Sequence, residues 1–290
     1  MQLVVKELSK TYPNGVHALK NVSLTISTGM FGLLGPNGAG KSTFMRTLAT
    51  LQQADSGTAF LGEIDMLGQP HEVRKLLGYL PQEFGVYPRT SAEQMLDHLA
   101  ILKGVSSRSQ RRELVVSLLQ RVNLYEHRRK NLSGYSGGMR QRFGIAQALI
   151  GKPKLLIVDE PTAGLDPGER NRFYNLLSEI GEQTIVILST HIVQDVKELC
   201  THMAIINNGE VLFAGTPDDA ESTLAGRIWA KSIPKADLTE HQNRYQVIST
   251  KLVAGRPLIH VYSQKSLEDG FESVTPDLED VFFSKINAVA

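Results

Sequence analysis

Residues 30–42 read MFGLLGPNGAGKS, and this stretch decides the fold. Its first five residues form a short apolar run typical of a buried strand, and a helical pattern extends from Lys41 to about Leu51. Between them, residues 35–42 fit the phosphate-binding pattern G-x-x-x-x-G-K-[ST]. Glycines let several backbone N–H groups point at phosphate oxygens, and the following helix directs its positive N-terminal end at the same anion. The stretch therefore predicts a strand–loop–helix unit that binds phosphate, with Lys41 on the β- and γ-phosphates and the Ser42 hydroxyl on Mg²⁺.

A second signal lies further along the chain, where the apolar run at residues 155–158 ends in Asp159 and Glu160. A buried strand in a parallel sheet delivers such carboxylates to the carboxyl edge, where the phosphate loop also opens. An apolar strand followed by Asp-Glu is a common pattern. Without a phosphate loop in the same chain, it indicates only a solvated strand end. After a phosphate loop, it predicts that Asp159 holds Mg²⁺ and that Glu160 polarises the attacking water.

The patterns around these two motifs predict an α/β fold. Strand-like runs at 155–158, 184–188 and 203–206 alternate with helical patterns at about 168–180 and 192–200, which favours a mostly parallel sheet covered by helices. Alternating residues before position 30, and an Asn-Gly turn within 205–213, predict antiparallel strands. Helical spacing between 91 and 150 predicts an inserted helical subdomain, in which Ser136, Gly137 and Gly138 form a second anion-binding helix start.

Together, these motifs and their order resemble the nucleotide-binding subunit of ATP-binding cassette (ABC) transporters. The order is phosphate loop, Gln82, Ser-Gly-Gly helix, Asp159-Glu160 and His191, and the resemblance covers roughly residues 1–220. It implies a P-loop NTPase core with a mostly parallel sheet, an N-terminal antiparallel β-subdomain and a helical insert at about 86–150. Residues 221–290 are then expected to form a small α+β accessory domain. The family signature usually begins with Leu and often has Gln after the glycines, whereas this chain has Tyr135 and Met139 there.

The resemblance also implies roles for individual residues. Glu160 is expected to be the catalytic base, His191 the switch histidine on the γ-phosphate, and Gln82 a contact to both the attacking water and the membrane partner. Mg²⁺ is expected on Ser42, Gln82 and Asp159. Residues 163–166 match the loop that crosses the dimer interface, and Ser136, Gly137 and Gly138 match the motif that reaches ATP on the opposite subunit. The full set expected to contact ATP is Tyr12, Gly35, Pro36, Asn37, Gly38, Ala39, Gly40, Lys41, Ser42, Thr43, Ser136, Gly137, Gly138 and Asp166.

The expected function is an ATP-hydrolysing subunit that drives a membrane transporter by closing and reopening a dimer. The partners are a second nucleotide-binding subunit, as homodimer or heterodimer, and separately encoded integral-membrane permease subunits that contact the region around residues 82–88. The expected location is the cytoplasmic side of the cell membrane, as a peripheral protein. The segment 275–283 is similar to the C-terminal end of cassettes from the drug, lipid and polysaccharide export branch, so export is favoured over import.

Composition excludes several other classes. Lys and Arg number 31 and Asp and Glu number 30, so a net charge of +1 argues against a protein that holds nucleic acid by bulk charge, and no nucleic-acid partner is expected. The single cysteine of the chain, Cys200, lies in a helical pattern and is predicted to be a core residue. No apolar run is long enough to span a bilayer. Two alternatives stay open: a soluble ABC-type ATPase acting on DNA or ribosomes, and a regulatory subunit that uses ATP only as a clamp.

Overall fold

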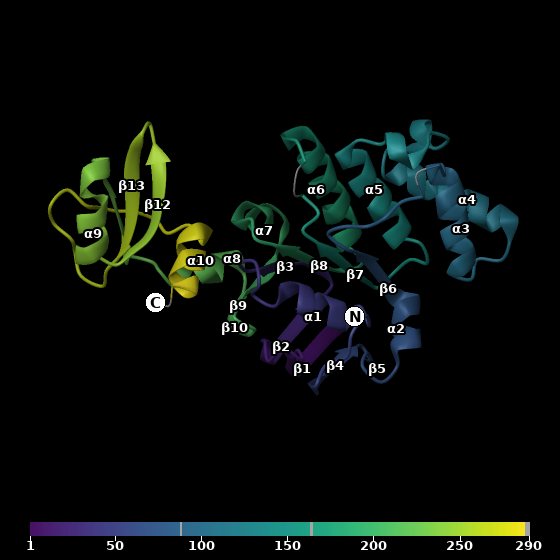
Figure 1. Cartoon of the computed structure of the whole chain (residues 1–290), viewed down its shortest axis with the longest axis horizontal. Helices are drawn as coiled ribbons and strands as arrows, with labels where there is room; N and C mark the ends of the chain where they lie inside the picture. The colour runs from purple at the N-terminus through teal and green to yellow at the C-terminus, as the bar shows by residue number, and fades with distance from the viewer. Residues whose placement is uncertain (88, 163–164, 288–290) are drawn as a thin grey trace.

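The computed structural model describes residues 1–87, 89–162 and 165–287. The molecule is elongated, with helices α3 (Ala92–Leu102) and α4 (Arg108–Arg121) at one end, a separate antiparallel sheet at the other, and a six-stranded sheet between them (Figure 1). Among the described residues, no helix combines the length and apolar character needed to cross a membrane.

The central sheet carries the motifs. Its strands, in spatial order, are β10 (Glu210–Gly215), β9 (His202–Asn207), β3 (Gly29–Leu34), β8 (Ile185–Thr190), β7 (Leu155–Asp159) and β6 (Leu77–Leu80). All neighbouring pairs are parallel except β9 and β10, which form the antiparallel hairpin expected from the Asn-Gly turn. Parallel alignment brings Leu34 beside Thr190 and Asp159 beside Ser189. The carboxyl ends of β3, β7 and β8 therefore meet at one edge.

The strands at the centre are apolar throughout because both faces are covered. In β7, Leu156 and Val158 enter one hydrophobic core, while Leu155 and Ile157 enter the other. The first core packs the sheet against α5, α6 and α7; the second packs it against α1 and the N-terminal sheet (Figure 1). Burial on both faces is why β7 shows a continuous apolar run and no alternation.

The N-terminal sheet is antiparallel, as predicted. Its strands, in spatial order, are β2 (His17–Ser27), β1 (Gln2–Thr11), β4 (Ser56–Leu61) and β5 (Ile64–Asp65). Leu3, Val5 and Leu24 point from this sheet into the second core, which places helix α1 between the two sheets. The N-terminal sheet and the helix that follows the phosphate loop thus share one hydrophobic core.

The described residues form ten α-helices, of which those near 41–51, 91–150, 168–180 and 192–200 were predicted from periodicity. They are α1 (Lys41–Leu48), α2 (Pro70–Leu76), α3 (Ala92–Leu102), α4 (Arg108–Arg121), α5 (Gly137–Ala148), α6 (Pro167–Gly181), α7 (Val193–Leu199), α8 (Pro217–Ser222), α9 (Leu238–Arg244) and α10 (Leu278–Ile286), with short 3₁₀ turns at Tyr125–His127, Leu132–Gly134 and Lys235–Asp237. Ser91 begins α3 with a capping box, which explains the sharp start of the helical segment. Cys200 is buried, as expected for a core residue, and burial raises the pKa of its thiol.

A third sheet follows the central one along the chain. It contains β12 (Val247–Val253), β13 (Arg256–Tyr262), β11 (Ile228–Ser232) and β14 (Glu272–Ser273) in spatial order. Helix α10 packs against α7, α8 and β12, and its Leu278 and Val281 belong to the same core as the central sheet. The division of the chain at residue 220 stays a prediction.

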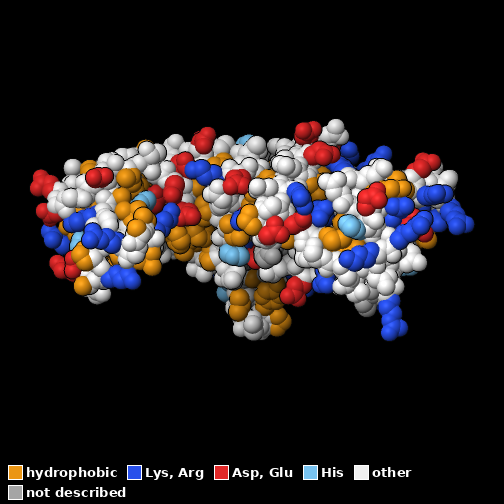
Figure 2. Space-filling view, turned by 90° about the horizontal axis from the view of Figure 1, so that it is seen from above, with side chains coloured by type: hydrophobic (Ala, Val, Ile, Leu, Met, Phe, Trp, Pro, Cys, Tyr) orange, Lys and Arg blue, Asp and Glu red, His pale blue; other side chains and the backbone are white. Residues whose placement is uncertain are grey.

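Basic residues of the helical region lie at one end of the molecule. Arg108, Arg112, Arg129 and Lys130 are exposed, and Figure 2 shows Lys and Arg side chains gathered at the end formed by α3 and α4. Arg108 and Arg112 lie on α4, whereas Arg129 and Lys130 lie in the turn after Tyr125–His127.

Candidate functional site

The phosphate loop joins β3 to α1 and holds the Lys41 side chain beneath it. Lys41 is buried, and its Nζ donates to the carbonyl oxygens of Gly35 at 2.6 Å and Pro36 at 3.0 Å. Gly40 has φ 106°, and a Cβ there would lie 2.4 Å from the carbonyl oxygen of Ala18, so only glycine fits. Burial lowers the pKa of the Lys41 ammonium, and the nearby Glu160 and Asp159 partly offset that effect. The loop therefore holds a buried ammonium group against its own carbonyl oxygens.

Glu160 lies at the end of β7, where three side chains converge on its carboxylate. Gln82 Nε2 donates to its Oε2 at 3.2 Å, His191 Nδ1 lies 3.2 Å from its Oε1, and Lys41 Nζ lies 3.8 Å from the same oxygen. The backbone N–H of Glu160 donates to the carbonyl oxygen of Ser189, and its φ of 44° turns the chain sharply after the strand. Four residues that are distant in sequence therefore form one cluster at the sheet edge.

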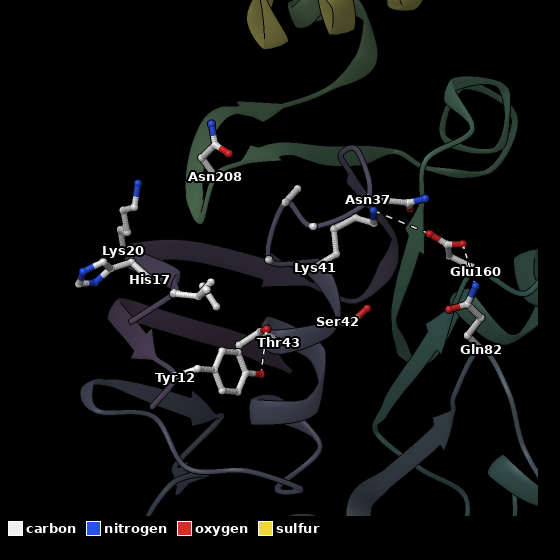
Figure 3. A pocket seen from close by; sticks show the side chains of 15 residues that line it. Tyr12, His17, Lys20, Asn37, Lys41, Ser42, Thr43, Gln82, Glu160 and Asn208 are labelled. Atoms are coloured by element: carbon white, nitrogen blue, oxygen red, sulfur yellow. Dashed lines mark hydrogen bonds and ion pairs between the residues drawn. The ribbon is translucent and has the colours of Figure 1, made fainter. Parts of the chain in front are cut away.

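A cavity of about 750 Å³ opens over the phosphate loop and reaches this cluster. Residues 37–43 form its floor, Gln82 and Glu160 one end, and Tyr12 the other (Figure 3). The Tyr12 hydroxyl lies 3.2 Å from the Thr43 hydroxyl and donates to Gln52 Oε1 at 3.1 Å, which fixes the ring at the cavity wall. The cavity thus contains a phosphate cradle at one side and an aromatic ring at the other.

Several residues that line this cavity were missed from the sequence. They are Val16, His17, Ala18 and Lys20 of the N-terminal sheet region and Asn208 of the β9–β10 turn. Gly209, the next residue of that turn, donates to the carbonyl oxygen of Ala39 and accepts from the N–H of Lys20. No local motif marks these positions, because only the packing of the hairpin turn against the loop brings them to the cavity.

Among the described residues, the Ser-Gly-Gly segment and Asp166 do not line this cavity. Ser136 caps α5 by accepting from the N–H of Met139 at 3.2 Å, and Asp166 caps α6 by accepting from the N–H of Glu169 at 2.9 Å. A Cβ on Gly137 would meet only open space, so the start of α5 is accessible from outside. Of the expected interface loop, residues 163 and 164 lie outside the described residues.

The unusual Tyr135 before this segment has a packing role. Its ring is 4% exposed and makes an edge contact with Phe143, with centroids 6.5 Å apart. Its hydroxyl donates to the carbonyl oxygen of His127 at 3.0 Å. Tyr135 therefore fills the core position at the start of α5 without reaching the exposed Ser136 and Gly137.

Asp159 provides the test of whether Mg²⁺ fits this site. The residue is 5% exposed, and its Oδ1 is buried with no hydrogen-bond partner among the described residues. Burial, and to a smaller extent Glu160, raise the pKa of its carboxyl, while the hydroxyls of Ser189 and Ser42 partly offset this. An unpartnered carboxylate oxygen beside a serine hydroxyl matches the oxygen donors that Mg²⁺ prefers. The residues present therefore fit a magnesium ion.

Asp159→Asn is expected to raise the thermal unfolding midpoint of the nucleotide-free protein by a few degrees. A carboxyl with a raised folded pKa contributes stability that is present below its unfolded pKa and lost as pH rises through the folded pKa. The Asn variant carries no titrating carboxyl and does not lose this stability. The difference between its unfolding midpoint and that of the parent should therefore be largest at neutral pH and shrink as pH falls towards 4. Calorimetry without nucleotide or Mg²⁺ measures this. A variant that melts below the parent at pH 7.5 would contradict the expectation.

The family model described as "ABC transporter" matches residues 19–163, which is half of the chain. The chain belongs to the ABC transporter family. It is therefore an ATP-binding and ATP-hydrolysing subunit of a membrane transporter. This family assignment confirms the resemblance drawn from the motifs, the α/β P-loop fold and the ATPase activity.

Individual relatives agree with the assignment. The ABC ATPase is 34% identical to the uncharacterized ABC transporter ATP-binding protein YxlF of Bacillus subtilis, over 99% of this chain and 100% of the relative. It is 35% identical to the daunorubicin/doxorubicin resistance ATP-binding protein DrrA of Streptomyces peucetius, over 76% of this chain and 67% of the relative. The dimeric, post-hydrolysis structure of the ATP-binding cassette MJ0796, with ADP and Pi, superposes with a TM-score of 0.67 at 26% identity, covering 74% of this chain and 98% of that one.

Proposed function

We propose that Glu160 is the base that activates the attacking water, with Gln82 and His191 holding the water and the γ-phosphate beside it. The observation that carries this proposal is the convergence of Gln82, His191 and Lys41 on the Glu160 carboxylate at the edge of the cavity. A base must lie within hydrogen-bond reach of the water, and the phosphate loop fixes where the γ-phosphate ends. Lys41 would leave the carbonyl oxygens of Gly35 and Pro36 for the phosphates when ATP binds.

Mg²⁺ would be held by Ser42, Asp159 and Gln82. When bound, the ion neutralises charge that develops on the phosphate oxygens. The chain's own contribution is the buried Oδ1 of Asp159, which has no partner among the described residues.

The second half of each nucleotide site is proposed to come from a partner cassette. Ser136 and Gly137 are exposed at the start of α5, with the buried Gly138 behind them, and none of the three lines the cavity of its own chain. A helix N-terminus attracts phosphate, so this segment is suited to a nucleotide bound elsewhere. The dimeric state described for MJ0796 supports a pair of cassettes with two ATP molecules between them. The pair can be two copies of this chain or one copy and a homologue.

A groove lined in part by Leu77, Gly78 and Tyr79 of β6 is proposed to seat the permease, in addition to the expected contact around residues 82–88. The groove has a volume of about 820 Å³ and includes Leu51, Tyr79, Leu99 and Leu102 among its lining. Leu102 is 70% exposed and Leu51 is 56% exposed, which is a high exposure for large apolar side chains that lie in one groove. A cytoplasmic helix of a membrane protein, laid in this groove, would cover them.

Leu102→Asp is expected to lower co-purification of the chain with its co-expressed permease by about tenfold or more, because a charge would be buried where Leu102 makes an apolar contact. ATP hydrolysis by the isolated chain should be unchanged. Pull-down from detergent-solubilised membranes measures the effect. Ile101→Asp is the matched control, since Ile101 is exposed on the same helix but does not line the groove. Equal retention of both variants would contradict permease docking in this groove and favour an ATPase with a non-membrane partner.

Export from the cytoplasmic face is the proposed direction. It is supported by the likeness of residues 275–283 to the export branch and by the resistance role printed in the name of the relative DrrA. Vesicles that contain the permease and carry the chain on their outer face provide the test. ATP added outside should drive substrate inward, and ATP-driven loss of preloaded substrate would indicate import.

A further inference from the structure

Asp195 on α7 is a buried carboxylate that receives four hydrogen bonds. It is 0% exposed, and its Oδ2 accepts from the hydroxyls of Thr162 at 2.7 Å and Thr190 at 2.9 Å. Its Oδ1 accepts from the Tyr174 hydroxyl and the Arg170 guanidinium. A buried charge is tolerated only when such partners satisfy it, and two donors on each oxygen allow one orientation.

The two donors on Oδ2 lie beside the proposed catalytic pair, Thr162 in the turn after β7 and Thr190 at the end of β8. Thr162 lies two residues after Glu160, and Thr190 lies immediately before His191. The Thr190 hydroxyl also accepts from the N–H of Ile192 at 2.9 Å, which fixes the chain on both sides of His191. One carboxylate oxygen therefore ties together the two segments whose side chains meet 3.2 Å apart.

The two donors on Oδ1 come from helix α6. Arg170 also donates to the Tyr174 hydroxyl at 2.6 Å, so the two side chains support each other. Burial and the hydrogen bond to Asp195 raise the pKa of the Tyr174 phenol, which keeps it protonated and able to donate. These contacts balance the charge of Asp195 and hold it in place without touching either loop.

We propose that Asp195 is a positioning residue for ATP hydrolysis, whose Oδ2 clamps the loops after β7 and β8 so that Glu160 and His191 face the same phosphate. The inference rests on the proposed roles of Glu160 and His191. Asp195 does not line the nucleotide cavity, so it acts on the reaction through the loops alone.

Asp195→Asn in the full chain is expected to lower kcat for ATP by about 10–100-fold while KM and ADP affinity change by less than about threefold, because small misplacements of catalytic groups cost rate and not binding. Asn keeps the size of the side chain but offers an NH₂ group where two donors already point. Steady-state hydrolysis and titration with ADP separate the two quantities. A lost or weakened nucleotide site with proportionate loss of kcat would indicate general disruption and overturn the inference.

Two isosteric variants keep the proposal testable if the Asn variant does not fold. Thr162→Val removes a donor on the catalytic side and should lower kcat by about tenfold. Tyr174→Phe, the matched control, removes a donor on the α6 side and should lower the unfolding midpoint while kcat stays within about threefold. Equal loss of kcat in both, or unchanged kcat in both Asp195→Asn and Thr162→Val, overturns the inference. Full activity in Glu160→Gln would instead overturn the proposed function on which it rests.

Discussion

Glu160→Gln is expected to slow ATP hydrolysis by about 10²–10⁴-fold, because the amide cannot take a proton from the attacking water. The amide can still accept from Gln82, lies near His191 and keeps the volume of the carboxylate, so ATP binding should persist. With ATP bound and not hydrolysed, contacts that exist only in the closed pair accumulate, and a dimer should be trapped. Single-turnover hydrolysis and size-exclusion chromatography with ATP measure the two effects.

The matched control is Glu160→Gln combined with Ser136→Arg. If Ser136 contacts ATP on the opposite subunit, the bulky side chain should abolish the trapped dimer while the cavity of each chain still binds nucleotide. A dimer that persists in the double variant would contradict the proposed role of the Ser-Gly-Gly segment. Hydrolysis by Glu160→Gln at the parental rate would show that another group is the base.

Lys41→Met is expected to lower kcat by about 10³-fold and to weaken ATP binding by tenfold or more, since the charge meets the β- and γ-phosphates. Met has a similar length and no charge. Because burial already lowers the pKa of Lys41, removing the ammonium should leave the nucleotide-free fold intact. Titration with ATP and steady-state hydrolysis measure the losses, and circular dichroism checks the fold.

Lys103→Met is the control for this second variant. Lys103 also donates to backbone carbonyl oxygens, those of Arg74 and Leu77, and burial lowers its pKa, but it lies outside the nucleotide cavity. The rate of ATP hydrolysis by the isolated Lys103→Met variant should stay within about threefold of the parental rate. A similar loss of ATP hydrolysis in both variants would contradict a specific role of Lys41 in the reaction.

Local patterns predicted much of the fold. The apolar runs of β3, β7 and β8 and the helical spacing of α5 to α7 are short-range signals that tertiary contacts reinforce, so their positions agree with the structure to within a few residues. Short elements such as α2 and β14 escaped prediction, because neither carries a continuous apolar run or a clear helical spacing of apolar residues. Residues 221–290 were expected to form a small α+β domain, but the packing of α10 against α7 depends on long-range contacts.

By itself, the sequence determined the chemistry of each motif: a glycine loop before a helix cradles phosphate, and a strand ending in Asp159-Glu160 delivers carboxylates to a sheet edge. These outcomes follow from spacing within one strand, loop and helix. Tertiary structure alone decided which motifs meet. Parallel pairing of β3, β8 and β7 places Lys41 and His191 beside Glu160, while the Ser-Gly-Gly segment does not line this cavity. The four hydrogen-bond donors to Asp195 come from three separate elements, and no spacing in the sequence predicts that they meet.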